Sequence, residues 1–122
     1  MNISNDTPTT EEIAKVFALL GQPARLNIVL VIGSEHACVC HLEAVLGLRQ
    51  AYISQQLMLL RAAGLVKTER SGRHIFYKLT DLHWLELIQQ AAKIKQIELP
   101  NFNLPDIEGC NYAPDSCRAQ VG

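Results

Sequence analysis

The sequence has no apolar run long enough to cross a bilayer, although apolar residues make up 48% of the 122 residues. Its first ten residues, MNISNDTPTT, have neither the basic region nor the apolar core of a signal peptide. Glycine-rich phosphate loops, catalytic base pairs, internal repeats and low-complexity segments are also missing, which argues against an enzyme. We therefore expect one cytoplasmic domain, small enough for oligomerisation to help stabilise it.

Net charge is nearly absent as well, at −1, but the charged residues are unevenly distributed. The balance is −3 over residues 1–48, +5 over residues 49–80 and −3 over residues 81–122. A chain that concentrates its positive charge in one segment is expected to bind phosphates there. The alternative is chance clustering of charges on a solvated surface.

The positive segment has the pattern of a helix followed by a hairpin. Between residues 50 and 63 apolar side chains recur at helical spacing, and Gly64 is expected to end that helix. Residues 65–70 and 74–79 are rich in β-branched and aromatic residues and are separated by a short turn, which predicts a β-hairpin. A helix followed directly by a basic hairpin is typical of a winged helix.

Two helices are expected before this unit. The first is amphipathic, with Thr9 or Thr10 as its cap, and it ends at Gly21. The second begins at Pro23 and includes the apolar run 26–32, for which a buried strand is the alternative.

A short helix over about residues 40–46 completes a helix-turn-helix, and a last helix follows Asp81 to about residue 97. The predicted fold class is mainly α with a β-hairpin wing (α+β), a dimeric winged helix-turn-helix. Residues 1–97 form the DNA-binding and dimerisation domain, and residues 98–122 an irregular cysteine-containing tail.

Cysteine is scarce, and all four cysteines lie in two pairs, Cys38 with Cys40 and Cys110 with Cys117. In a reducing compartment they indicate metal binding or redox sensing rather than structural disulfides. Side chains two residues apart diverge by about 200° on a helix but share one face of an extended segment. Cys38 and Cys40 can therefore hold one ion only where the chain is extended or distorted. Alternatively, they are small buried apolar side chains.

Four segments carry a resemblance to a known family: LLGQPARLNIVLVI, CVCHL, ISQQLMLLRAAGLV and IFYKLTD. Together they resemble the ArsR/SmtB family of small dimeric metal-responsive winged-helix repressors, over roughly residues 13–97. The resemblance implies a dimer formed by the first and last helices, and repression that ends when an inducer binds. Arg49 and Ala51 stand where many members have serine and proline, so the cap is weaker while a phosphate contact is gained.

The DNA face is expected on the predicted second helix of the motif and on the wing, with Gln50, Ser54 and Gln55 facing the bases. The residues expected to contact DNA are Arg49, Gln50, Tyr52, Ser54, Gln55, Gln56, Arg61, Arg70, Arg73, His74 and Lys78. Those expected at the dimer interface are Phe17, Trp84, Leu85, Ile88 and Ala92.

Three possible sensing sites are considered, two that bind a metal ion and one that responds to oxidation. Asp81 and His83 match half of the last-helix zinc site of some family members, but Ile94 and Ile97 stand near the other half, so we regard that site as lost. Cys38 and Cys40 resemble the Cys-x-Cys of the family's arsenic, cadmium and lead sensors.

The expected inducer at this pair is a thiophilic ion, As(III), Cd(II), Pb(II) or Zn(II), held by Cys38, Cys40, Cys110 and Cys117. A thiol-based redox or sulfide-responsive repressor is the alternative, and a dithiol metal chaperone or thiol enzyme is the alternative of another class.

Overall fold

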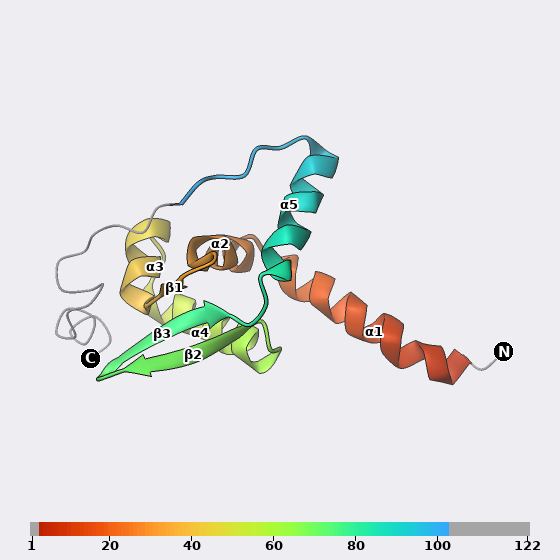
Figure 1. Cartoon of the computed structure of the whole chain (residues 1–122), viewed down its shortest axis with the longest axis horizontal. Coiled ribbons are helices and arrows are strands. Elements are labelled where there is room, and N and C mark those ends of the chain that lie inside the picture. Colours follow the sequence, from red (N-terminus) through yellow and green to blue (C-terminus); the bar gives the residue numbers. More distant parts are fainter. Residues whose placement is uncertain (1–2, 103–122) are drawn as a thin grey trace.

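The computed structural model describes residues 3–102, and within that range it has five helices and three strands. Figure 1 shows them along the chain. They are α1 (Ile3–Leu20), α2 (Pro23–Ile32), β1 (His36–Ala37), α3 (Val39–Leu46), α4 (Gln50–Ala62), β2 (Val66–Ser71), β3 (His74–Leu79) and α5 (His83–Lys95). The predicted fold class is confirmed: this is a winged helix-turn-helix.

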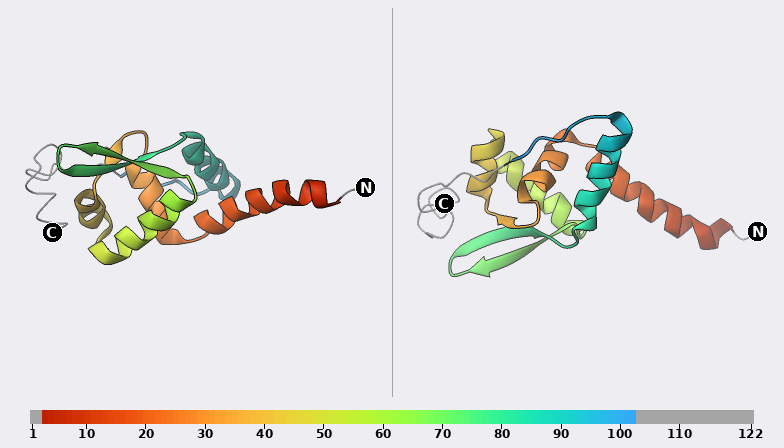
Figure 2. Two further views of the ribbon diagram at one scale, coloured as in Figure 1. Left: turned by 90° about the horizontal axis from the view of Figure 1, so that it is seen from below. Right: turned by 45° about the horizontal axis from the view of Figure 1, so that its top comes forward.

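The first two helices differ in burial. Helix α1 begins at Ile3, so the predicted cap at Thr9 or Thr10 is wrong, because a threonine before acidic residues favours a helix start without forcing one. Helix α2 is a helix rather than a strand, and Pro23 occupies its first turn, where a missing N–H costs no hydrogen bond. Its apolar run is uniform because α2 lies inside the molecule, surrounded by the other elements (Figure 2).

The turns around α3 and α4 lie where the glycines indicate. Gly47 ends α3 in the left-handed conformation, at φ 67°. Gly64, at φ 85°, follows α4, and there the backbone N–H of Leu65 donates to the carbonyl of Leu60 at 2.9 Å. The helix-turn-helix and its predicted boundaries are thereby confirmed to within one residue.

The wing is the antiparallel hairpin of β2 and β3, in register from Val66 opposite Leu79 to Ser71 opposite His74. The strand β1 has two residues and was not predicted, because it is too short to show a pattern in the sequence. His36 pairs with Lys78 and Ala37 with Tyr77, so the sheet order is β1-β3-β2. The chain segment directly before Cys38 is therefore part of the wing's sheet.

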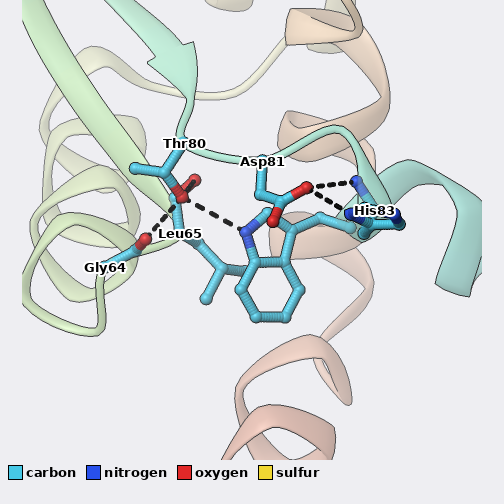
Figure 3. A network of polar contacts seen from close by, with 6 residues as sticks. Gly64, Leu65, Thr80, Asp81 and His83 are labelled. Carbon is cyan, nitrogen blue, oxygen red and sulfur yellow. Dashed lines mark hydrogen bonds and ion pairs between the residues drawn. The ribbon is translucent and has the colours of Figure 1, made fainter.

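A polar network joins the end of the wing to both neighbouring helices (Figure 3). The Thr80 hydroxyl donates to the carbonyl oxygens of Gly64 at 2.6 Å and Leu65 at 3.2 Å, and accepts the indole N–H of Trp84 at 3.3 Å. Asp81 accepts the backbone N–H of His83 at 2.9 Å. The N-cap residue of α5 is Leu82, so Asp81 binds the start of the helix from one residue before the cap. The end of α4, the end of β3 and the start of α5 are thus fixed together.

The core lies between α2, α3, α4, the sheet and α5. Ile88 of α5 belongs to it and is only 6% exposed, so its predicted place at a dimer interface is corrected: its side chain packs within its own subunit. Beyond α5, Leu99 and Phe102 are partly buried against the same core without forming a helix or strand. Cys110 and Cys117 lie outside the described residues.

Within residues 3–102, no single helix has the length and apolar composition to span a membrane. The two helical segments Thr9–Leu20 and Pro23–Ile32 reach the required length and apolar composition when they are taken together, but the chain bends by 87° between them.

Candidate DNA-binding face and cysteine site

The exposed side of α4 carries a surface depression. It is lined by Gly47, Leu48, Arg49, Ala51, Tyr52, Ser54, Gln55 and Met58. Four residues expected to contact DNA therefore share this surface, namely Arg49, Tyr52, Ser54 and Gln55. Met58, 68% exposed, was missed, although its position four residues after Ser54 places it on the same helix face.

The basic side chains extend this face to both sides. Arg61, in the last turn of α4, is exposed, as are Arg70 and Arg73 on either side of the wing's turn. Lys78, opposite Lys67 in the hairpin, is half-buried. The cations are therefore spread over α4 and the wing, an arrangement suited to phosphates on a double helix.

Two residues expected at the DNA face are buried instead. Gln56 is 6% exposed, and its Oε1 accepts a hydrogen bond from Nη1 of Arg25 at 2.9 Å, while Nε of Arg25 donates to the Leu19 carbonyl at 2.6 Å. His74 is 4% exposed at the start of β3, near Phe76. Both predicted contacts are corrected, because a side chain inside the protein cannot reach a phosphate or base.

The buried position of Gln56 could have been predicted. Gln56 lies three residues after Ile53 and four before Leu60, on the apolar stripe of α4. Its hydrogen bond with Arg25 joins α4 to α2.

Cys38 and Cys40 meet at the start of α3. Cys38 is its N-cap residue, extended at φ −94° and ψ 171°, and Cys40 lies in the first turn. This is the extended entry that the spacing required; the Cα atoms are 5.4 Å apart, and the two sulfurs form a disulfide in this structure. Both side chains are buried, together with Phe76 of the wing.

His41 is the close partner of Cys38, although it was not among the predicted site residues. Its Nδ1 accepts the Cys38 backbone N–H at 3.2 Å and lies 3.4 Å from Cys38 Sγ, while the Cys38 side chain accepts the His41 backbone N–H. This reciprocal cap fixes the Cys38 sulfur at the N-terminus of α3.

The other histidines differ in their surroundings. The ring of His36 contacts Phe76 edge-on at 4.6 Å, whereas both ring nitrogens of His74 lack a hydrogen-bond partner among the described residues. His83 binds Asp81 through Nδ1 at 2.6 Å on the surface. The backbone N–H and then the imidazole of His83 lower the pKa of Asp81, and the hydrogen bond to Asp81 and its charge raise the pKa of His83.

No group of three or more His, Cys, Asp or Glu side chains within residues 3–102 is placed to hold a metal ion. Cys38 and Cys40 bring two sulfurs together, and in this structure they are bonded to each other, so an ion there would need the reduced pair. Further ligands would have to come from outside this range or from a second chain.

The predicted dimer face on α1 and α5 is partly exposed. Phe17 is 59% exposed, and Trp84, Leu85 and Ala92 are intermediate. Phe17 and Ala92 line one apolar groove together with Leu26 and Leu99.

Comparison with known proteins places these features in context. Residues 22–68 match the model of the family described as "Bacterial regulatory protein, arsR family". The chain is 34% identical over 82 residues to the Transcriptional repressor SmtB homolog of Synechocystis sp., covering 67% of this chain and 62% of that protein. The matched region thus spans less than two thirds of that relative.

Other relatives are covered more fully. Identity is 40% over 83 residues with the Biofilm growth-associated repressor of Agrobacterium fabrum, covering 68% of this chain and 71% of that protein. A Cadmium resistance transcriptional regulatory protein CadC homolog of Staphylococcus aureus is 32% identical, over 66% and 67% respectively. The structure of the transcriptional repressor BigR from Xylella fastidiosa superimposes with a TM-score of 0.66 at 32% identity, covering 77% of this chain and 96% of that one.

Proposed function

The chain belongs to the ArsR/SmtB family, and from this premise we propose that it is a dimeric transcriptional repressor released from its operator by a thiophilic ion bound at Cys38 and Cys40. The observation that carries the proposal is the meeting of both sulfurs at the first turn of α3. Relatives in this family are repressors rather than enzymes, and we assign no catalytic residue.

The DNA-binding part of the proposal rests on α4 and the wing. Ser54 and Gln55 read bases from the depression on α4, with Gln50 at the start of the helix, because an amide can form paired hydrogen bonds with adenine. Phosphates are held by Arg49, Arg61, Arg70, Arg73 and Lys78, with Tyr52 against the sugar-phosphate backbone. Gln56 and His74 are left out of this set.

The dimer brings two such faces to one duplex. Phe17, Trp84, Leu85 and Ala92 pack across a two-fold axis, while Ile88 supports α5 from within. Two copies of α4 then reach successive major grooves about 34 to 36 Å apart, and the operator is an imperfect palindrome.

The inducer fits the donor atoms at the start of α3. Thiolates are the preferred ligands of As(III), Cd(II), Pb(II) and Zn(II), and a family relative is named for cadmium resistance. Two thiolates leave an ion incompletely coordinated, since Zn(II) takes four ligands in most protein sites. Cys110 and Cys117 of the tail, residues 98–122, are the proposed remaining ligands.

Release of the DNA on ion binding follows from the position of Cys38 and Cys40. The Cys38 sulfur and His41 cap α3, and only the turn at Gly47 separates α3 from α4. An ion that changes the first turn of α3 therefore shifts the support of the DNA-binding helix. A coupling free energy of about 1 to 3 kcal/mol between ion and DNA is typical of such systems.

A titration tests this function. The reduced protein is titrated with arsenite, Cd(II), Pb(II) and Zn(II), while thiolate absorption and release of a selected DNA duplex are followed together. Cys38→Ser/Cys40→Ser should bind the duplex as the native chain does but stay bound at ion concentrations that release the native protein. Release of this double variant at the native concentration would place the sensing site elsewhere.

A second candidate function uses the same two sulfurs. The disulfide between Cys38 and Cys40 favours a redox-responsive repressor. Two thiols would give up two electrons and two protons to hydrogen peroxide, forming the S–S bond and two water molecules. If the metal-free protein leaves DNA on oxidation by peroxide and returns after reduction, whereas ions have no effect, this second function replaces the first.

A further inference from the structure

We propose that Met58 of α4 recognises thymine in the major groove through apolar contact with its 5-methyl group. The inference rests on the proposed function and deepens it, because it adds a base contact of another kind to the hydrogen bonds assigned to Ser54 and Gln55. It makes Met58 a specificity-determining residue of the DNA-binding face.

Met58 lies on the outward side of α4, beside the residues assigned to base reading. It follows Gln55 by three residues and Ser54 by four, and side chains at these spacings share one face of a helix. All three line the same surface depression. The helix itself lies at the edge of the molecule (Figure 2, left). Because 68% of its surface is exposed, the Met58 side chain is available to a partner.

The surface around Met58 is apolar. Leu48, Ala51 and Tyr52 line the depression together with it, and no carboxylate does so among the described residues. Apolar surface gains free energy when another apolar group removes it from water. The 5-methyl group of thymine is the apolar group that base pairs present in the major groove, so it is the part of a duplex that this surface fits.

The charges of α4 indicate that this surface meets a duplex rather than a second protein. Its 13 residues include one cation, Arg61 in the last turn, and no carboxylate, while Arg49 directly precedes the helix. These two arginines are separated by about 18 Å along the helix axis. The major groove is about 12 Å wide with phosphates on both sides. A helix with cations at both ends and with apolar and amide side chains between them matches this groove.

Met58 and Gln55 have the spacing of neighbouring base pairs. Their separation corresponds to a rise of about 4.5 Å along the helix, and stacked base pairs are about 3.4 Å apart. When Gln55 binds adenine in one pair, Met58 therefore lies at the next pair. A methionine side chain is unbranched and flexible, so it can adjust to the position of a methyl group.

Replacement of thymine by deoxyuridine tests the inference, because it removes only the 5-methyl group. The probe is a duplex that the native protein selects from random sequences, and each thymine of its two half-sites is replaced in turn. Affinities are compared for the native protein, Met58→Ala and Leu59→Ala at one salt concentration. Leu59 is the matched control, since it is the next residue of α4 and 46% exposed but lies outside the set that lines the depression.

Loss of one buried methyl group should weaken binding of the native protein roughly fourfold at the thymine that Met58 contacts. Met58→Ala should bind the thymine duplex more weakly and should lose this sensitivity to deoxyuridine, whereas Leu59→Ala should keep it. The affected thymine should lie in the pair next to the one at which Gln55→Ala alters preference. A general loss of stability would not remove sensitivity to a single methyl group, so this readout separates recognition from folding.

Equal deoxyuridine penalties in the native protein and Met58→Ala at every thymine would overturn the inference. Selected half-sites without thymine would overturn it as well, as would native affinities that no deoxyuridine changes. If Met58→Ala changes only sedimentation, the surface contacts a second copy of the chain and the inference is wrong. All these results leave the proposed function intact, which fails separately if the native protein enriches no duplex over random sequences.

Discussion

Gln55 and Gln56 are neighbours in α4 with the same chemistry, and the structure predicts opposite consequences for their replacement by alanine. Gln56 is buried and accepts a hydrogen bond from Arg25, whereas Gln55 is exposed in the surface depression. Gln56→Ala should therefore reduce stability, and Gln55→Ala should change the DNA sequence that the protein prefers.

The expected loss of stability in Gln56→Ala follows from the hydrogen bond with Arg25 that the substitution removes. A hydrogen bond to a charged group contributes about 1.5 to 3 kcal/mol, and Arg25 keeps its bond to the Leu19 carbonyl and is partly in water. We expect a loss of about 2 kcal/mol, which lowers a urea midpoint by roughly 1 M for a typical denaturant slope. Gln55→Ala should change stability by less than about 0.5 kcal/mol.

The assay combines urea unfolding, at one fixed protein concentration because a dimer is expected, with a DNA selection under conditions where both variants are folded. Gln55→Ala should alter preference at one base pair by about 1 to 3 kcal/mol, and Gln56→Ala should select the native sequence. A Gln56→Ala protein with native stability and a changed preference would refute the assignment of the two roles.

Four further outcomes are expected. Thr80→Val keeps the shape of the side chain but loses the hydroxyl, so the free energy of unfolding measured in urea should fall by about 1 to 2 kcal/mol. An unchanged free energy would show that this network does not stabilise the fold. Arg73→Ala should weaken binding to all duplexes alike and reduce the salt slope by about two units, about one for each subunit of the dimer, whereas a sequence-dependent loss would contradict a phosphate contact. Phe17→Asp should give monomers in sedimentation, and an intact dimer would disprove that interface. Asp81→Asn should lower the His83 pKa toward its ordinary value in an NMR titration, because the raised pKa depends on the carboxylate; any stability from protonated His83 is present below that ordinary value and is lost as pH rises through the raised one.

The sequence was most informative where a local rule and a periodic pattern agreed. Gly47 and Gly64 ended helices as expected, and the apolar stripe of α4 gave that helix to within one residue. The extended entry at Cys38 followed from the two-residue spacing of the cysteines, since only that geometry lets both sulfurs meet. Each of these inferences needed only nearby residues.

The errors concern tertiary contacts between distant segments. His74 is buried because β3 places it on the same strand face as Phe76, and Gln56 is buried because Arg25 from α2 meets it. The apolar stripe of α4 indicates that Gln56 faces inward, but its partner Arg25 cannot be identified from local sequence, and nor can the burial of His74. Ile88 was assigned to the wrong surface for a similar reason, since an apolar residue on α5 can pack inward or toward a second chain.

The short strand β1 sets an energy scale for communication between the cysteine segment and the wing. It is joined to β3 through only two residue pairs, His36 with Lys78 and Ala37 with Tyr77. Ladder hydrogen bonds contribute about 0.5 to 1.5 kcal/mol each, so separating β1 from β3 costs about 1 to 3 kcal/mol. A longer strand would strengthen this attachment, which adds to the burial of Cys38 and Cys40 with Phe76 of the wing. This contribution is of the size by which one ligand usually changes the binding of another, so a change at Cys38 can alter the pairing of β1 with the wing while Leu79 keeps β3 packed in the core.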